Sequence, residues 1–314
     1  MSFSTSTKDE LARLETKKEC CELAELASLV RMNGVLQISA NQKYSLNVVT
    51  ESAPVARKVF NLAKKRLQLP VDIVVRRKLR LRKNNSYLVK IFPEGVADLE
   101  KLGLFNEQGE ILAGIDKKLI RKQCDQKAYL RGAFLVGGSI SNPEGHYHLE
   151  ISTNDKLLAE GICGLLNKFD LNAKISTRKR FFVVYLKESN RIFEFLALIG
   201  AYQALFEFEN IRILKDMRNQ VNRIVNCETA NLSKTVDASV RQLNSIRLIE
   251  RTIGLKTLPK NLYETARLRL EFPDSSLKEL GEMLNPKIGK SGVNHRFRKI
   301  EEIAKKIKEE QGRE

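Results

Sequence analysis

The side chains best suited to recognition chemistry lie near the carboxyl end of the chain, where amide, imidazole and basic groups share a short segment. They are Ser291, Asn294, His295, Arg296, Arg298 and Lys299. Helical spacing places Asn294, His295 and Arg298 on one face, with the serine ahead of them and the other two cations at its flanks. Because Asn can pair bidentately with adenine and Arg with guanine, this face predicts base reading in DNA rather than catalysis.

Two predicted helices would position this face. Ser276 and Glu279 form a capping box that opens a short helix, and residues 285–289 form a turn. The second helix starts near residue 290 and has an apolar stripe on its other side, made of Val293, Phe297, Ile300 and Ala304. A short helix, a turn and a basic helix are typical of a helix-turn-helix, whose second helix enters the major groove. An ordinary helical hairpin with a solvated basic face is the alternative.

A second group of cations follows one predicted strand. Twelve Lys and Arg and a single Asp fall between positions 57 and 90, which gives +11 of the net +17 of the chain. Residues 71–82 read as a strand, and a period of two places four cations on one face: Arg76, Lys78, Arg80 and Arg82. Like charges at successive positions of one face repel unless a polyanion neutralises them, so we expect contact with the phosphate backbone. A solvated face that adds only solubility is the alternative.

The predicted order of helices and strands that includes this strand occurs twice in the sequence. Residues 26–34 (LASLVRMNG) and 130–138 (LRGAFLVGG) lie 104 positions apart, and the same offset aligns Cys20 with Cys124. Each nonapeptide ends a predicted helix, and each is followed by two strands, a helix, two strands and a helix. The order α-β-β-α-β-β-α therefore appears at about 20–106 and again at 124–203. We predict an α+β fold with pseudo-two-fold symmetry, followed by an all-α domain.

The two nonapeptides resemble the LAGLIDADG motif of homing endonucleases, in which paired motif helices pack at a pseudo-two-fold axis and saddle-shaped sheets straddle DNA. Small residues such as Ala27, Gly132 and Ala133 suit such close packing. In those nucleases the penultimate motif position is an acid that holds a divalent metal at the scissile phosphate. Asn33 and Gly137 occupy these positions here, and neither supplies the charge that Mg²⁺ needs. We therefore expect no catalytic residue, no enzymatic activity, no metal and no other cofactor.

The carboxyl-terminal third narrows the resemblance. From about residue 206 the pattern is helical, with a polar break expected at 226–234 (NCETANLSK). This segment, together with LKELGEML and SGVNHRFRKI, resembles the WhiA family of bacterial regulators, and the resemblance covers nearly the whole chain. It implies a DNA-binding transcription regulator of cell division and chromosome segregation or of sporulation, with a WhiB-type or other protein partner. We expect a LAGLIDADG-like domain at 1–205, a helical linker at 206–257 and a helix-turn-helix domain at 258–314.

Composition indicates the partner class and the compartment. The 314 residues include 55 Lys and Arg against 38 Asp and Glu, which favours double-stranded DNA as the partner. No apolar run is long enough to span a membrane, and residues 1–19 lack a signal-peptide core, so we expect a cytoplasmic, nucleoid-associated protein. Five cysteines without a C-x-x-C motif argue against a disulfide framework or a zinc ribbon. The repeat lets Cys20 and Cys124 approach each other, but we favour burial as small apolar side chains over a redox pair.

Other readings of the sequence are weaker. His146 and His148 share a strand face, but no third ligand has suitable spacing for a metal. An architectural nucleoid protein with little sequence preference is the main alternative function, and a residual nuclease is disfavoured by the missing acids. The amino-terminal domain could also serve as a platform for another protein without touching DNA.

Overall fold

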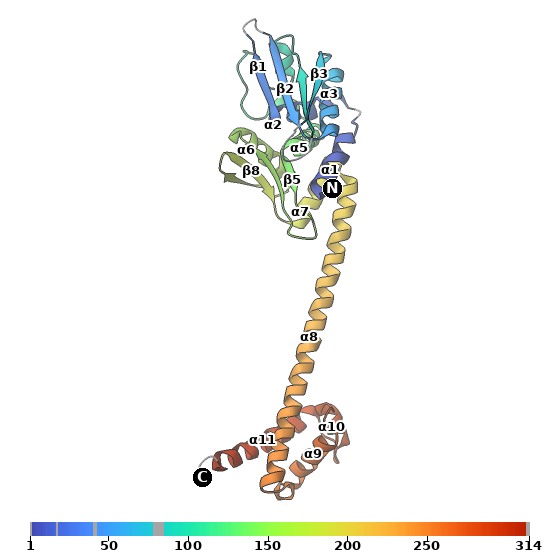
Figure 1. Cartoon of the computed structure of the whole chain (residues 1–314), viewed down its shortest axis with the longest axis vertical. Coiled ribbons are helices and arrows are strands. Elements are labelled where there is room, and N and C mark those ends of the chain that lie inside the picture. The colour runs from blue at the N-terminus through green and yellow to red at the C-terminus, as the bar shows by residue number, and fades with distance from the viewer. Residues whose placement is uncertain (1, 17, 40–42, 78–84, 312–314) are drawn as a thin grey trace. The chain divides into compact units, whose positions relative to one another are not determined.

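The structure is a computed structural model that describes residues 2–16, 18–39, 43–77 and 85–311, with only the main chain described for Arg77. Residues 1–216 and 217–314 form two compact units, each with its own apolar core. The first unit contains the two sheets found among the described residues, and the described part of the second is helical (Figure 1).

The first half of the first unit folds as one sheet covered by helices. Its elements are α2 (Glu19–Asn33), β1 (Gly34–Ile38), β2 (Tyr44–Thr50), α3 (Ala53–Leu67), β3 (Val71–Arg77), β4 (Asn85–Ile91) and α4 (Val96–Lys101). The antiparallel strands lie in the order β1-β2-β4-β3. Alternation along the strands turns Leu46, Val48, Val89 and Ile91 toward the buried side. The described part of the basic strand ends at residue 77, so Lys78, Arg80 and Arg82 lie outside the described residues.

The second half repeats this arrangement. After the short helix η1 (Lys117–Ile120) come α5 (Gln123–Gly137), β5 (Gly138–Ile140), β6 (Leu149–Thr153), α6 (Lys156–Asn167), β7 (Lys174–Arg178), β8 (Phe181–Leu186) and α7 (Ser189–Ile199). Its antiparallel strands lie in the order β5-β6-β8-β7, which matches the first sheet position by position. The expected α+β fold with an internal repeat is confirmed.

The two halves meet along α2 and α5, the helices that carry the nonapeptides. The contact is close because small residues line it. A Cβ atom on Gly132 of α5 would lie 2.7 Å from the carbonyl oxygen of Glu25 and 2.9 Å from the Cβ of Ser28, both on α2. Real side chains do not approach backbone this closely, so position 132 requires glycine for the observed helix separation.

A buried ion cluster lies at the same interface. The carboxylate of Glu25 is fully buried, 2.6 Å from Nζ of Lys58 in α3 and 3.2 Å from Nε of Arg131 in α5. Lys58 also donates to the carbonyl of Leu11 at 2.8 Å, and Arg131 donates to that of Ile199 at 3.1 Å. Burial lowers the pKa of Lys58, and the neighbouring Glu25 carboxylate offsets part of that effect. Because each buried charge has partners on other helices, removing one member would leave the others uncompensated.

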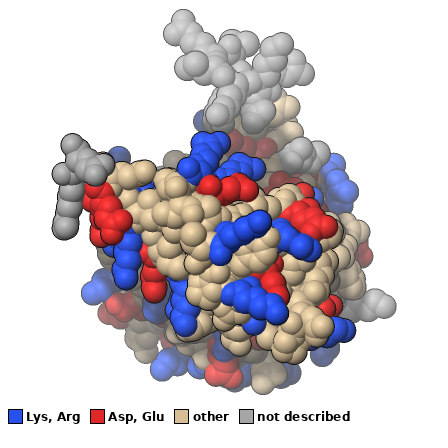
Figure 2. Space-filling view, turned by 90° about the horizontal axis from the view of Figure 1, so that it is seen from below, with Lys and Arg blue, Asp and Glu red and all other residues tan. Residues whose placement is uncertain are grey.

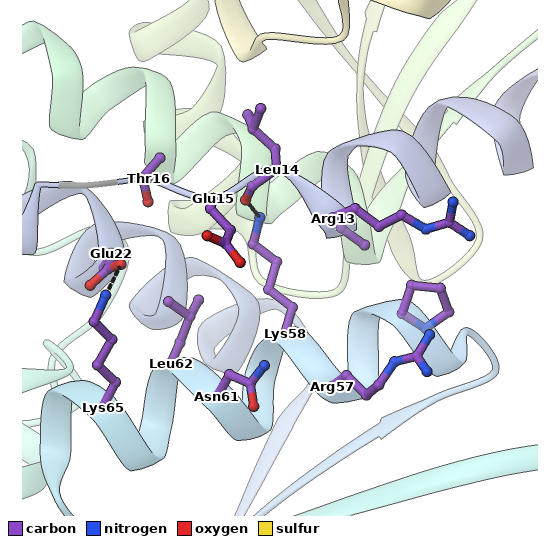
Figure 3. A pocket seen from close by; sticks show the side chains of 12 residues that line it. Arg13, Leu14, Glu15, Thr16, Glu22, Arg57, Lys58, Asn61, Leu62 and Lys65 are labelled. Carbon is purple, nitrogen blue, oxygen red and sulfur yellow. Dashed lines mark hydrogen bonds and ion pairs between the residues drawn. The ribbon is translucent and has the colours of Figure 1, made fainter.

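The amino-terminal helix α1 (Phe3–Arg13) was not among the expected elements. Phe3, Thr7 and Leu11 recur every four residues and are buried, so one side of this otherwise polar helix packs into the first unit. The ammonium of Lys58 donates to the carbonyl of Leu14, just beyond the helix, at 2.9 Å (Figure 3). The mixed composition of residues 1–19 hid this short apolar stripe.

The helix α8 (Tyr202–Thr252) runs across the boundary between the two units. The carboxylate of Glu10 accepts hydrogen bonds from the amides of Gln203 at 2.8 Å and Ala204 at 3.0 Å, which satisfies two amides of its first turn. The expected break at residues 226–234 is wrong, because the helix continues through them. The segment contains neither Gly nor Pro, and its Ala, Leu, Glu and Lys favour helix, so its polar residues cover an exposed helical surface.

We expect Gly132→Ala to lower the free energy of unfolding of the first unit by about 1–3 kcal/mol, because the added methyl group overpacks the contact between α2 and α5. Urea unfolding followed by circular dichroism measures the change. The control is Gly164→Ala in α6, where an added Cβ meets nothing within 4 Å and removes chain entropy from the unfolded state. Equal losses in both variants would show that the helix contact tolerates a side chain.

Candidate nucleic-acid interface

Three helices and the end of α8 form the core of the second unit. They are α9 (Lys260–Glu271), α10 (Leu277–Met283) and α11 (Lys290–Gln311), and the short helix η2 (Leu255–Thr257) precedes them. The apolar stripe predicted for α11 is confirmed, since Val293, Phe297, Ile300 and Ala304 are all buried in this core. One side of α11 is therefore fixed against its neighbours, and the other side is free to contact a ligand.

The capping box and the turn set the geometry of the pair formed by α10 and α11. The Ser276 hydroxyl accepts from the Glu279 amide at 3.3 Å, and the Glu279 carboxylate accepts from the Ser276 amide at 2.7 Å, as predicted. The bond from that amide lowers the pKa of Glu279. After α10 the Ile288 amide donates to the Gly281 carbonyl at 3.1 Å. A Cβ on Gly281 would lie 2.2 Å from the Ile288 carbonyl oxygen, so glycine is needed for this close approach.

A buried arginine holds these helices together. Arg269 of α9 is 2% exposed, and its Nε donates to Oε1 of Gln242 in α8 at 3.1 Å. Its Nη1 donates to the carbonyl oxygens of Pro273 at 3.2 Å and Ser275 at 2.5 Å, directly before α10. The guanidinium carbon lies 5.3 Å from the ring centroid of Phe297 in α11. Burial lowers the pKa of Arg269, but these acceptors replace its water and fix α10 and α11 against α9.

The outer face of α11 carries most of the residues predicted to read bases. Ser291, His295, Arg298 and Lys299 are exposed, and Asn294 is half-buried. Among the residues that the structure describes, none of these five side chains makes a hydrogen bond or an ion pair. Their donors and acceptors are therefore available to an external partner.

Arg296 lies differently from its neighbours. Its Nη1 donates to the Asn261 carbonyl at 3.2 Å and to the Thr265 hydroxyl at 3.2 Å, both on α9. The side chain is half-buried and packs against α9, and the DNA contact expected at this position stays a prediction. Helical spacing in the sequence placed Arg296 at the flank of the outer face, but it could not reveal the acceptors at Asn261 and Thr265.

The basic strand of the first sheet is described only in part. Arg76 is exposed on β3, on the sheet face that also carries Asp72 and Val74 and points away from the core. The other three cations of the predicted row, Lys78, Arg80 and Arg82, lie outside the described residues. The row that they form with Arg76 therefore stays a prediction.

The net charge of +11 between positions 57 and 90 overstates how many cations are free to contact DNA, because some of them are paired with acidic side chains. On α3, Lys65 lies 2.7 Å from the Glu22 carboxylate, and Arg66 is paired with both Glu22 and Glu19 of α2. Figure 3 shows Lys65 and Glu22 at the wall of a hollow of about 610 Å³. On the surface drawn in Figure 2, the described Lys and Arg side chains are likewise interspersed with Asp and Glu. The cations that can contact DNA are therefore set by their individual positions more than by the total number of Lys and Arg.

A basic and aromatic cluster on the second sheet was not predicted. It lines a hollow of about 620 Å³, and its basic members are His146, His148, Arg178, Lys187 and Lys215. Nζ of Lys187 lies 5.2 Å from the ring centroid of Tyr185, and the ring of His148 stacks on the same tyrosine at 6.0 Å. The outer face of this sheet carries Arg178 of β7 and Tyr185 of β8, and Lys187 follows directly after β8. The alternation of side chains along these two strands was the sequence signal that could have revealed the cluster.

The positions of the missing motif acids lie at the carboxyl ends of α2 and α5. The Asn33 side-chain amide donates to the carbonyl of Val49 in β2. A Cβ on Gly137 would lie 2.4 Å from Cε of Met32 and 2.6 Å from the carbonyl oxygen of Ser152. The first position therefore carries a neutral amide, and the second has no room for a carboxylate.

The amino ends of the same two helices bring together Cys20, Cys21, Cys124 and Asp125, whose sulfur and carboxylate oxygen atoms all lie within 4.8 Å of one another. The approach of Cys20 and Cys124 allowed by the repeat is confirmed, although both are half-buried and Cys21 is the buried thiol. Burial raises the pKa of Cys21 to about 12. Burial also opposes ionisation of Asp125, but hydrogen bonds from the thiols of Cys20 and Cys124 keep its pKa below the ordinary value.

Comparison with known proteins agrees with this architecture. Family models described as the WhiA N-terminal LAGLIDADG-like domain, the WhiA LAGLIDADG-like domain and the WhiA C-terminal HTH domain match residues 19–105, 126–218 and 221–304. The chain belongs to the WhiA family. The repeat of the first unit corresponds to the WhiA LAGLIDADG-like models, and the helices of the second unit correspond to the WhiA HTH model. Among the described residues, no helix is both long and apolar enough to cross a membrane.

Individual relatives share nearly the full length. A protein of Desulfitobacterium hafniense named probable cell division protein WhiA is 68% identical over 313 residues, covering 100% of this chain and 98% of its own. A protein of Heliobacterium modesticaldum with the same name is 53% identical over 315 residues, covering 99% and 98%. The crystal structure of full-length DUF199/WhiA from Thermatoga maritima is 27% identical with a TM-score of 0.59, covering 98% and 99%. The WhiA fold therefore extends over the whole chain.

We expect Gly281→Ala to lower the free energy of unfolding of the second unit by about 1–3 kcal/mol, because the new methyl group would collide with the carbonyl of Ile288. Gly289→Ala is the control, since an added Cβ there lies in open space. Thermal melting followed by circular dichroism compares the two variants. Indistinguishable melting temperatures would mean that the turn adjusts without loss.

Proposed function

We propose that this protein is a sequence-specific DNA-binding regulator, in which the outer face of α11 reads bases in the major groove. The observation that carries the proposal is the group of five polar side chains on that face, none of which is paired within the described structure. Arg298 has the geometry to bond two acceptors of guanine, and Asn294 can pair with adenine. The close approach of Ile288 to Gly281 of α10 and the contacts of the buried Arg269 hold α11 in place, as contacts that discriminate between sequences require.

The names of the relatives indicate a biological setting. Because close relatives are named probable cell division proteins, we place this regulator in the control of cell division, and with it chromosome segregation or sporulation. A WhiB-type or other regulator that binds the first unit is part of the same proposal. The protein would act in the cytoplasm, at the nucleoid.

A role without nuclease activity is the second part of the proposal. Metal-assisted cleavage needs carboxylates that hold the ion at the scissile phosphate. The neutral Asn33 and the sterically closed position of Gly137 support a scaffold that binds without cutting. An architectural nucleoid protein remains the competing function, supported by the basic composition of the chain.

Arg298→Ala should weaken binding to specific DNA by about 1–3 kcal/mol and relax discrimination at one base position, because a bidentate contact is lost. Lys306→Ala removes the same charge from a later turn of α11 and serves as the control. Genome-wide mapping of crosslinked fragments, followed by titration of a selected site and of random DNA, measures both effects. If Arg298→Ala weakens binding equally on both DNAs, α11 holds phosphate rather than reading bases.

The outer faces of the two sheets should contribute contacts that do not depend on sequence. Arg76→Ala and Lys187→Ala are each expected to weaken binding to all sequences and to reduce the salt slope by about 0.9, the value for one phosphate contact. Lys156→Ala, on the exposed surface of α6, is the control cation. Affinity measured from low to moderate salt gives the slopes. Unchanged slopes would assign the sheets to a protein partner instead.

A further inference from the structure

The cysteine cluster at the amino ends of α2 and α5 is not used by the proposed function. Cys20 and Cys21 lie in the first turn of α2, and Cys124 and Asp125 lie in the first turn of α5. Their four ligand atoms lie within 4.8 Å of one another, although the two pairs are more than a hundred residues apart in the chain. Asp125 is 4% exposed and Cys21 is 5% exposed, so half of the set is shielded from water.

Internal symmetry explains the meeting of these side chains. The offset of 104 positions that aligns the two nonapeptides also aligns Cys20 with Cys124 and Cys21 with Asp125. Equivalent positions on two helices that pack about a pseudo-two-fold axis lie beside each other where the helices are close. Each half supplies two adjacent ligands, so the set forms without a C-x-x-C motif.

We propose that Cys20, Cys21, Cys124 and Asp125 form a binding site for a thiophilic divalent metal ion such as Zn²⁺. Three sulfur ligands and one carboxylate oxygen complete a tetrahedral set, which is the geometry of a closed structural zinc site. A Zn–S bond of about 2.3 Å gives a tetrahedron with edges of about 3.8 Å. The ligand atoms lie within 4.8 Å of one another in the structure. Side-chain rotations that move these atoms by about 1 Å would bring them to the distances of the tetrahedron.

The surroundings of the site orient its carboxylate. Oδ2 of Asp125 accepts from the main-chain amide of Lys122 at 3.3 Å. This leaves Oδ1 directed at the sulfurs, 3.4 Å from Sγ of Cys124 and 3.8 Å from Sγ of Cys21. The bond to the amide is the outer contact that ligating carboxylates usually have. The positive ends of both helix dipoles favour the negative charge of a thiolate-rich complex.

Binding of the ion conserves charge and protons. One Zn²⁺ displaces the protons of three thiols, joins the ionised carboxylate and gives a complex of net charge −2 with three protons released to solvent. Lys18 and Lys122 are the N-cap residues of the two helices, so a basic residue lies within three positions of each pair of ligands in the chain. The bound ion would join the first turns of α2 and α5 and thereby stabilise the first unit.

A disulfide is the alternative chemistry for this cluster. It would use two of the sulfurs and leave the third thiol and the carboxylate without a role. The presence of four convergent ligands favours the metal ion.

The test uses the full chain with Cys163→Ser and Cys227→Ser, which removes the two cysteines outside the cluster. The reduced protein is freed of metal with a chelator and titrated with Co²⁺, whose absorption reports tetrahedral thiolate ligation, and then with Zn²⁺. We expect one equivalent of each ion to bind, Zn²⁺ to displace Co²⁺, and the melting temperature to rise. The double variant itself should bind as the natural chain does.

Variants of the cluster supply the decisive comparison. Cys124→Ser and Asp125→Asn should each weaken Zn²⁺ binding by more than about 10-fold, since direct ligands matter at least as much as the groups that orient them. Circular dichroism without metal shows whether each variant is folded, and a folded variant that binds Zn²⁺ as tightly as the parent overturns the site. Absence of a tetrahedral Co²⁺ spectrum in the reduced parent overturns it as well.

Discussion

The close contact between α2 and α5 is the constraint on which the first unit depends. Gly132 allows the two helices to approach until backbone meets side chain, and the buried Glu25 then reaches cations on α3 and α5. Each helix leads directly into the first strand of its sheet, so the helix pair also sets where β1 and β5 begin. The placement of both outer sheet faces therefore follows from a buried helix contact.

Charge pairing inside the protein decides which cations remain for a partner. The acids of α2 neutralise cations of α3, so a window of sequence with a large positive balance contributes less to the surface than its count suggests. Beside the second sheet, His148 and Arg178 are paired with Glu150. Lys187, just after β8, and Lys215 of α8 instead lie over aromatic rings, and their ammonium groups have no carboxylate partner in the described structure. A polyanion would meet cations held in place by rings, which suits contact with phosphate.

Sequence reasoning succeeded where the signal was periodic and local. The two α-β-β-α-β-β-α repeats, the capping box at Ser276 and the buried stripe of α11 all depend on residues within a few positions of one another. Local patterns could not show contacts with distant partners, such as those of the Arg296 guanidinium with acceptors on α9. Residues 226–234 show a different limit, because an exposed stretch of helix is as polar as a loop and only the absence of Gly and Pro distinguished them. The cysteine cluster required the fold, since its halves come from separate repeats.

The two ends of the helix pair have diverged in opposite directions. At the carboxyl ends, loss of the acids is built into the packing as well as the sequence, because any side chain at position 137 would strike the main chain of Ser152. A carboxylate there would require β6 to move, and with it the sheet that would straddle DNA. At the amino ends, the same pseudo-symmetry gathers three thiols and a carboxylate. The two ends of the helix pair therefore differ: position 137 at the carboxyl end of α5 has no room for a carboxylate, whereas the amino ends bring ligand atoms from both halves to one point.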